Sequence, residues 1–209
     1  MSLAWFARPV LAVLALLAPV TLLRAALPTT ERGPEHASLA GQLLVAAPTM
    51  GDPRFQRTVI LMVEHSPNGA LGLAVNLPIG ERPLASLLEM LGEKDVNVAG
   101  KVRIFAGGPV QPDIGFVLHT ADYHRAETHP IDSRVAMTSS REILRDIGND
   151  KGPEKSLIAF GYSGWGPHQL EDELARGAWF TTPGEIKLIF DEDRDKVWEA
   201  AFAARTRDL

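Results

Sequence analysis

The sequence predicts a single domain that mixes β-strands with α-helices. Residues 58–63 form a continuous apolar run rich in β-branched side chains, which is typical of a strand. The Ser-Pro-Asn-Gly sequence at residues 66–69 favours a tight turn, so the apolar residues 70–76 are expected to return as an antiparallel partner. Further along, residues 157–160 indicate a buried strand, residues 161–166 hold three glycines that favour a turn, and an amphipathic helix follows.

The helix that follows the glycine-rich segment is bounded by residues that suit helix ends. Pro167 has the fixed φ of a first helical turn, and Gly177 stands where a helix commonly ends. Leu170 and Leu174 lie one turn apart and mark the buried stripe. The acidic residues 171–173 are therefore expected to face water.

Short apolar runs elsewhere in the sequence predict the remaining strands. These strands are expected at residues 43–47, 102–105, 115–119, 135–137 and 186–190. Each run has the length of a strand, and turn-forming or polar residues flank it. Loops are expected at residues 48–53, which contain two prolines, and at residues 121–130, which are polar.

Three other helices are predicted. The leucines within residues 84–91 repeat at i, i+3, i+4 and i+7, after a proline and before a glycine, which indicates a short amphipathic helix. Residues 139–142 fit a capping box, so a helix should begin there and end at Gly148. A last helix is expected from about residue 193, with Val197, Trp198 and Phe202 buried. Large aromatic side chains dominate burial, so the core or a lid is the expected place for Trp165, Trp179 and Trp198.

Length and composition fit one globular domain with a substantial core. The chain has 209 residues, of which 45% are hydrophobic and 22% are charged. Its formal net charge is −5, and because residues 1–30 hold two arginines and no acid, the remainder has 19 basic and 26 acidic residues, or −7. An acidic domain without a basic run predicts no direct nucleic-acid binding. The lack of cysteine excludes disulfides and thiolate chemistry.

Residues 1–30 form an apolar N-terminal extension, and residues 31–40 form a linker to a single domain at residues 41–209. Residues 10–23 are almost wholly apolar and lie between two arginines. That length suits a signal-peptide core better than a membrane span of about 20 residues, although residues 3–23 together are long enough to contact a membrane. Export, membrane anchoring and an extension without a targeting role therefore remain alternative interpretations.

Several motifs occur in a fixed order along the chain. They stand at residues 41–55, 63–65, 68–72, 76–78, 107–110, 115–119, 161–165, 169–171 and 178–179. Together these motifs resemble the AlgH/YqgE family of bacterial proteins, and the resemblance extends from Gly41 to about Trp198. It implies an α+β fold in which a mostly antiparallel sheet curls into a partial barrel, with helices packed outside.

The same resemblance implies a location and a label, but no reaction. Members of the family are expected in the cytoplasm and have been labelled transcriptional regulators, without an established catalytic mechanism or cofactor. Two features of this chain depart from the family pattern. The apolar extension leaves membrane anchoring or export as an alternative to the cytoplasm, and His168 stands where glycine is common.

No catalytic residue, metal site or cofactor is predicted. The Gly-Tyr-Ser-Gly-Trp sequence at residues 161–165 lacks the last glycine of a nucleophile elbow, so Ser163 is interpreted as part of a structural turn. The six histidines have no metal-ligand spacing on a predicted helix. Glu64 and His65 are neighbours on a strand and should point to opposite faces, which favours a role at the sheet end over an acid–base pair. Residues 107–109 lack the lysine of a phosphate-binding loop.

The predicted hairpin also locates a candidate binding site. Its register should place Asn76 beside residues 59 and 60, on the order of 15–20 Å from Glu64 and His65. The loop at residues 48–53 enters at the same end, and the turn near residue 108 is expected to join it. The candidate ligand- or partner-binding residues are therefore Thr49, Asp52, Arg57, Asn76, Gly107, Gly108 and Tyr162. Alternatively, Asp52 and Asn76 only satisfy backbone groups at turns.

Two functions from different classes are compatible with these features. The first is a non-enzymatic binding or regulatory domain that acts through a protein or a small ligand. The second is a hydrolase or transferase that uses Asp52, His65 or His119. The first is favoured, because spacing alone assembles no nucleophile and base.

Overall fold

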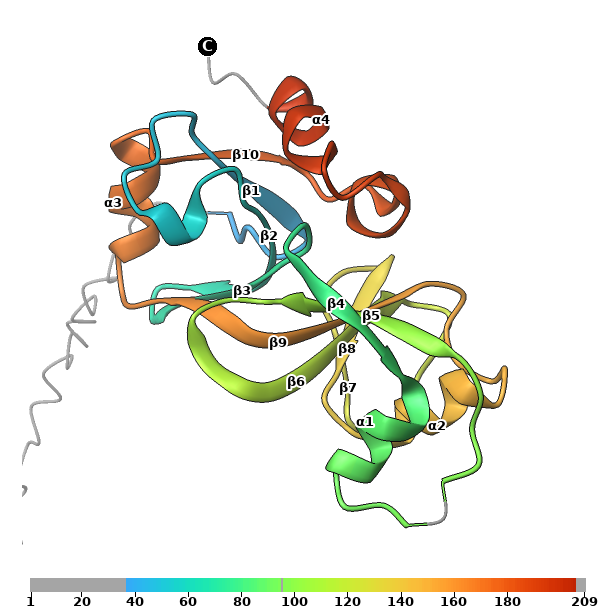
Figure 1. The fold of residues 1–209 in the computed structure, drawn as a ribbon. Helices are drawn as coiled ribbons and strands as arrows, with labels where there is room; N and C mark the ends of the chain where they lie inside the picture. The colour runs from blue at the N-terminus through green and yellow to red at the C-terminus, as the bar shows by residue number, and fades with distance from the viewer. Residues whose placement is uncertain (1–36, 95, 206–209) are drawn as a thin grey trace, which may run out of the picture. The chain divides into compact units, whose positions relative to one another are not determined.

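The computed structural model describes residues 37–94 and 96–205, which form one compact unit (Figure 1). The predicted extension at residues 1–30 lies outside the described residues, as does most of the linker. The strands are β1 (Gln42–Ala46), β2 (Val59–Ser66), β3 (Gly69–Ala74), β4 (Pro78–Pro83), β5 (Lys101–Ala106), β6 (Val110–Thr120), β7 (Thr128–Pro130), β8 (Val135–Thr138), β9 (Ser156–Trp165) and β10 (Trp179–Pro183). The helices are α1 (Leu84–Met90), α2 (Glu142–Gly148), α3 (Gln169–Ala175) and α4 (Val197–Ala204), with short helical turns η1 (Pro53–Phe55) and η2 (Lys187–Asp191).

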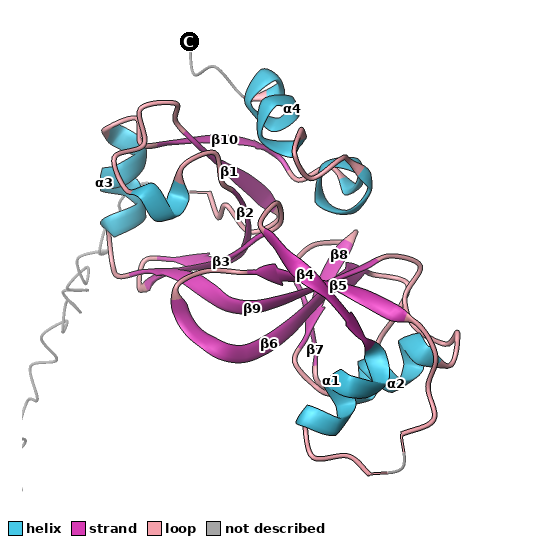
Figure 2. Cartoon of the chain, viewed as in Figure 1, coloured by secondary structure: helices cyan, strands magenta, loops and turns pink. Residues whose placement is uncertain are grey.

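The described strands join into one curled, mostly antiparallel sheet. Its order is β10-β1-β2-β3-β9-β6-β8-β7, and the antiparallel pair β4–β5, with α1 between the two strands in the chain, joins it through a parallel pairing of β5 with β9. The helices lie outside the strands, with α3 and α4 near β10 and β1, and α1 and α2 at the other end (Figure 2). The predicted α+β fold with a curled antiparallel sheet is confirmed.

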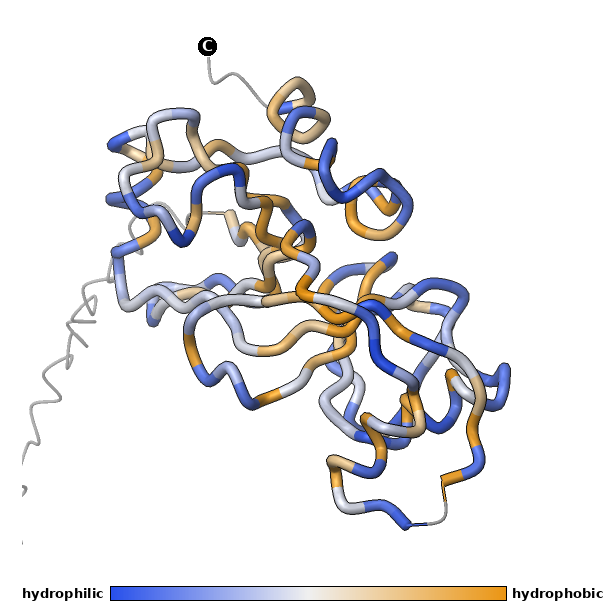
Figure 3. Tube along the Cα trace, in the orientation of Figure 1, coloured by the Kyte–Doolittle hydropathy of each residue, from blue (hydrophilic) through white to orange (hydrophobic). Residues whose placement is uncertain are grey.

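Side-chain alternation along the strands explains the buried interior. In β1, Leu43 and Val45 pack into the largest apolar cluster, whereas Leu44 joins a second cluster on the opposite face of the strand. All three side chains are fully buried, because α4 and α3 cover the two faces. A third cluster lies under α1 and α2, and it includes Leu88 and Ile143. Hydrophobic stretches of the chain accordingly gather where the strands cross (Figure 3).

The predicted hairpin of β2 and β3 is confirmed, including its register. Ser66 pairs with Gly69 next to the turn, and six residues before Ser66, at the other end of the hairpin, Ile60 pairs with Ala74. A bulge between Met62 and Glu64 shifts the pairing by one residue. The helix predicted at residues 84–91 and most of the predicted strands are also confirmed.

The predicted turn at residues 161–166 is wrong. Strand β9 continues from Ser156 through Trp165, so the glycine-rich segment lies in the middle of the sheet and pairs with β3 and β6. Glycine serves close backbone packing here: a Cβ atom at Gly161 would overlap the Gly108 carbonyl oxygen. Helix α3 begins only after His168, which has a φ of +62°, while the predicted end near Gly177 is confirmed by that residue's φ of +69°.

The predicted strand at residues 186–190 is also wrong, because this apolar run forms the helical turn η2. A short run of four apolar residues and one lysine fits either structure, and periodicity alone does not distinguish a strand from a helical turn. Strands β4, β7 and β10 were not predicted: β7 occupies the end of the loop expected at residues 121–130, and every residue of β4 is exposed, with prolines at both of its ends. Helix α2 ends at Gly148 as predicted, but Arg141 stands at its N-cap and makes no side-chain cap hydrogen bond, so the capping box is wrong.

The expectation that residues 171–173 face water holds only for Asp172. The Glu173 carboxylate accepts hydrogen bonds from the indole N–H groups of Trp165 and Trp179, at 2.9 and 2.8 Å. The two indoles are buried and meet edge to face, as core residues should. Glu171 Oε1 lies 2.9 Å from His65 Nε2. Helix α3 is therefore attached to the sheet by polar as well as apolar contacts.

Candidate functional site

Asn76 and Arg57, two of the predicted site residues, come together at the start of β2. Asn76 Oδ1 accepts the Val59 N–H at 2.8 Å, and its Nδ2 donates to the Arg57 carbonyl at 2.8 Å. The Arg57 guanidinium instead pairs with Glu199 and lies over the Trp198 ring, 4.5 Å from its centroid. Asn76 thus holds the backbone that leads into β2, as the alternative interpretation expects.

Asp52 and Thr49 lie in the loop between β1 and β2. Asp52 Oδ1 accepts the Arg54 N–H at 3.0 Å and caps the helical turn η1. Its hydrogen bonds from the Arg54 side chain and backbone lower the pKa of this exposed carboxyl. Thr49 is exposed. No hydrogen bond joins either residue to Asn76 within the described residues, and a shared binding role for the three residues remains a prediction.

Gly107, Gly108 and Tyr162 meet inside the sheet. The Gly107 N–H donates to Phe160 O at 2.7 Å, and its carbonyl accepts the Ala74 N–H at 2.8 Å. A Cβ atom at Gly108 would overlap the backbone of Tyr162. These glycines therefore permit close backbone packing between the β5–β6 connection and β9. Ligand binding by any of the predicted residues remains a prediction.

The residues named for a catalytic alternative also lie in separate environments. His65 Nδ1 accepts the Leu39 N–H at 3.1 Å while Nε2 faces Glu171. His119 is fully buried, with Nε2 2.9 Å from Thr138 Oγ1 and Nδ1 2.9 Å from Thr120 O. Within the described residues no hydrogen bond joins these histidines to Asp52 or to each other. Ser163 Oγ is buried without a described partner.

Protonation of His119 should destabilise the fold. Burial lowers the pKa of His119 below its ordinary value of 6.5, and this outweighs the Thr120 carbonyl and Asp122, which raise it. The unfolded chain therefore takes up the proton first, and stability should be lost as the pH falls below about 6.5. His119→Gln should flatten the slope of unfolding free energy against pH in this range, measured by urea unfolding. Equal slopes for the two proteins would contradict this role.

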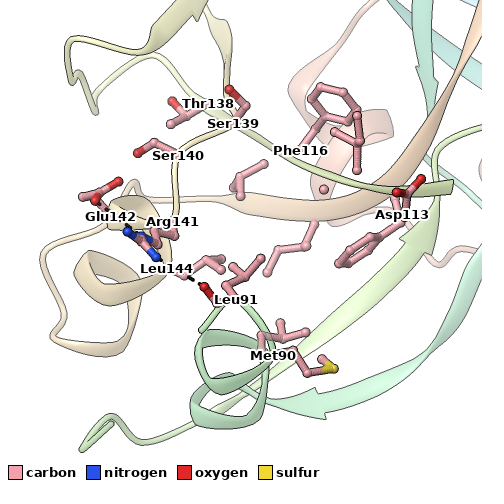
Figure 4. A pocket seen from close by; sticks show the side chains of 16 residues that line it. Met90, Leu91, Asp113, Phe116, Thr138, Ser139, Ser140, Arg141, Glu142 and Leu144 are labelled. Atoms are coloured by element: carbon pink, nitrogen blue, oxygen red, sulfur yellow. Dashed lines mark hydrogen bonds and ion pairs between the residues drawn. The ribbon is translucent and has the colours of Figure 1, made fainter. Parts of the chain in front are cut away.

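A cavity that sequence reasoning missed lies between α1, α2 and the sheet (Figure 4). Its volume is about 760 Å³. Strands β6, β8 and β9 supply the floor, and the ends of α1 and α2 supply the walls. The lining is mainly apolar: Leu87, Met90, Leu91, Ile114, Phe116, Val117, Leu144, Ile158 and Phe160. The polar or charged lining residues are Asp113, Thr138, Ser139, Ser140, Arg141 and Glu142, and Gly115 of β6 completes the lining.

A bulge in β6 shapes one rim of this cavity. The pairing of β6 with β9 shifts between Val110 and Gly115, and Gln111 within this interval has a φ of +48°. Below the bulge, Gly161 packs against the Val110 carbonyl and the Pro112 backbone. The bulge brings Asp113 and Ile114 to the rim. Bulges and left-handed residues other than glycine commonly mark functional sites.

Large apolar side chains are exposed around the same rim. Met90 is 68% exposed, Leu91 49% and Ile114 39%. A second cavity of about 270 Å³ shares Leu87, Met90 and Phe160 with the first and adds Ile79, which is 64% exposed. One feature of the sequence relates to this surface. Leu91 belongs to the leucine repeat that predicts α1, but it follows the last residue of the helix and is not covered by the core.

The charges beside the cavity are unevenly paired. Arg145 contacts Glu93 at 2.6 Å, while Arg141 lies 3.6 Å from Glu93 and 3.9 Å from Glu142. Arg141 also donates to the Leu91 carbonyl at 3.3 Å. Asp113 forms no ion pair with any residue in the described ranges. The positive charges of Arg141 and Arg145 equal the negative charges of Glu93 and Glu142. Asp113 therefore adds one negative charge that no described ion pair neutralises.

Metal and membrane features are not found in the described part of the chain. Among residues 37–94 and 96–205, no group of three or more His, Asp or Glu side chains is placed to hold a metal ion. No helix formed by these residues has the length and apolar character needed to cross a membrane.

Comparisons with known proteins identify relatives over most of the chain. A family model described as AlgH-like matches residues 43–209. A UPF0301 protein from Sphingopyxis alaskensis is 43% identical over 163 residues, which cover 78% of this chain and 87% of the relative. A UPF0301 protein from Jannaschia sp. is 44% identical over 165 residues, covering 78% and 86%.

Solved structures share the fold. The solution structure of the AlgH protein from Pseudomonas aeruginosa has a TM-score of 0.69 and 39% sequence identity, covering 81% of this chain and 90% of that one. A crystal structure of a protein from Corynebacterium diphtheriae has a TM-score of 0.62 at 21% identity, covering 81% and 88%, and this likeness concerns the fold alone.

Proposed function

The chain belongs to the AlgH-like family, and from this premise we propose that it is a non-enzymatic binding domain whose site is the cavity between α1, α2 and the sheet. The observation that carries the proposal is the coincidence of that cavity with exposed Met90, Leu91 and Ile114. Large apolar side chains exposed together are typical of surfaces that a ligand or partner covers.

The composition of the cavity supports binding. Its volume of about 760 Å³ lies within the usual range for ligand sites, which is roughly 300–1,000 Å³. An apolar floor with a few polar groups at the edge also fits such sites. Ser140 supplies one of these polar groups; its hydroxyl is buried beside the Glu142 carboxyl, whose pKa it helps to lower.

The alternative of a hydrolase or transferase has less support. Asp52 is engaged in capping η1, His65 in holding Leu39 and Glu171, and His119 in a buried contact with Thr138. None of the three lines the cavity. A catalytic proposal needs a nucleophile and a base within hydrogen-bond reach of each other.

The proposal predicts that an apolar probe binds at this rim. N-phenyl-1-naphthylamine, an uncharged apolar dye, should bind the protein, with dissociation followed by fluorescence titration. Ile114→Glu should weaken binding by about tenfold or more, because it removes an apolar contact worth about 1.5–3 kcal/mol. Val110→Glu is the matched control, since Val110 is an exposed apolar residue of the same strand that does not line the cavity.

The affinity of Val110→Glu for the dye should stay within about twofold of that of the unchanged protein. A surface charge outside the cavity changes the binding free energy by only a few tenths of a kcal/mol. Equal weakening by both variants, or no saturable dye binding, would contradict the proposed site. Circular dichroism of each variant establishes that the fold is retained.

A further inference from the structure

The apolar surface at this site extends beyond one cavity. Leu87, Met90 and Phe160 line both the larger cavity and the smaller one. Met90 lines both cavities, Ile114 only the larger one and Ile79 only the smaller one, and all three side chains are exposed. A compact small molecule in one cavity would leave much of this apolar surface in water, whereas an extended segment could cover both parts.

Negative charge stands at two ends of the larger cavity. Asp113 on the β6 bulge and Glu142 at the start of α2 lie at opposite sides of its lining (Figure 4). Asp113 is exposed and makes no ion pair within the described ranges. Glu142 contacts the Ser140 side chain and lies 3.9 Å from Arg141, and its own side chain is half exposed. Both carboxylates are therefore accessible to positive charges on a ligand.

The positive charge of Arg141 does not make the cavity favourable for an anionic ligand. Its guanidinium faces the Leu91 carbonyl and lies within 4 Å of both Glu93 and Glu142. A ligand carboxylate placed beside Arg141 would compete with these two carboxylates, and one placed at the opposite side of the cavity would meet Asp113. The chain's net charge of −5 acts in the same direction. Arg82 adjoins the smaller cavity, so basic ligand groups belong at the larger one.

We infer that this surface docks an amphipathic peptide segment of a partner protein, with apolar side chains on the cavity floor and basic side chains beside Asp113 and Glu142. The inference rests on the proposed function and adds the class of partner. Apolar anchors would supply most of the affinity, while the charge pairs at the rim would select the partner and set its orientation. An anionic lipid surface does not fit, because the rim would repel it.

The inference is tested with a short fluorescent peptide of alternating Lys-Leu-Leu units, measured by anisotropy at low ionic strength. Two companion peptides replace every Lys by Glu or every Leu by Ser. The lysine peptide should bind, and each companion should bind at least about tenfold more weakly, since one loses the charge pairs and the other the apolar anchors. Anionic phosphatidylglycerol vesicles should not retain the protein in co-sedimentation.

Two charge reversals separate a docked peptide from general attraction to an acidic protein. Asp113→Lys should weaken binding of the lysine peptide by about fivefold or more, and the effect should shrink at high salt. Asp195→Lys is the matched control, because it makes the same change in net charge at an exposed residue outside both cavities. It should change affinity by no more than about twofold.

The outcomes distinguish this inference from the proposed function. If the glutamate peptide binds as well as the lysine peptide, if both charge reversals weaken binding equally, or if only vesicles bind, the inference is wrong. Dye binding that depends on Ile114 would still support the cavity as a binding site in that case. If the dye and the peptides all fail to bind, the proposed function is wrong as well.

Discussion

Replacing Gly161 with alanine is expected to lower the free energy of unfolding by about 3–5 kcal/mol, whereas Gly177→Ala should cost about 1 kcal/mol. Both glycines have a positive φ, +72° and +69° respectively, so a methyl group strains the two backbones alike. Their surroundings differ. A Cβ atom at Gly161 would overlap the Gly108 carbonyl oxygen and lie 3.0 Å from Val110 O, while the space around Gly177 is open to 4 Å.

Urea unfolding of the two variants measures this difference directly, and Gly177→Ala serves as the control for backbone strain without crowding. Gly161 also supports the β6 bulge that carries Ile114 to the cavity rim. Gly161→Ala should therefore weaken binding of N-phenyl-1-naphthylamine at urea concentrations well below the main transition. Similar losses of stability at both glycines would show that packing against the β6 bulge contributes little.

Local sequence patterns correctly predicted the strands and helices that are bounded by recognisable turn-forming or helix-ending residues. The β2–β3 hairpin follows from a β-branched strand and a Pro-Asn-Gly turn, and helix α1 follows from its leucine repeat. The register of the hairpin also placed Asn76 beside Val59 correctly, because pairing is determined once the turn is known. Each of these features depends on contacts between residues close in the sequence.

The features that were missed depend on contacts between distant residues. The glycines of residues 161–164 suggest a turn by themselves, and only the approach of Gly108 explains why they lie within a strand. Residues 187–191 form a helical turn whose apolar side chains fit the main core, although their composition equally suits a strand. The cavity combines α1, α2 and three strands, so no single stretch of sequence contains it.

The environment of Glu173 also depends on residues distant in the sequence, so its exposure was predicted wrongly. Replacing Glu173 is expected to have the second large effect on stability. Its position on the polar face of α3 predicts exposure, but its Oε2 accepts hydrogen bonds from two buried indoles. A buried Trp N–H needs an acceptor, and this requirement outweighs the helical pattern. Glu173→Leu leaves both N–H groups of Trp165 and Trp179 without that acceptor, and is expected to cost about 2–4 kcal/mol of unfolding free energy.

Two further variants isolate the cause of that loss. Glu173→Gln keeps an amide oxygen that can accept from the indoles, but its NH₂ group then faces the Gln169 side chain, which now donates to Glu173 Oε1 at 2.9 Å. Its expected cost is intermediate, about 1 kcal/mol. Asp172→Leu is the matched control on the same helix, because Asp172 is exposed, and it should change stability by no more than about 0.5 kcal/mol.

Urea unfolding gives the three free energies, and NMR of the indole N–H groups gives a readout that packing alone would not change. Hydrogen exchange at Trp165 and Trp179 should accelerate in Glu173→Leu and much less in Glu173→Gln. Because these two residues end β9 and begin β10, loss of their shared acceptor loosens α3 from both strands at once. If Glu173→Leu is as stable as Asp172→Leu, water must replace the carboxylate at the indoles, and the apolar contacts of Leu170 and Leu174 together with the Glu171–His65 contact attach the helix.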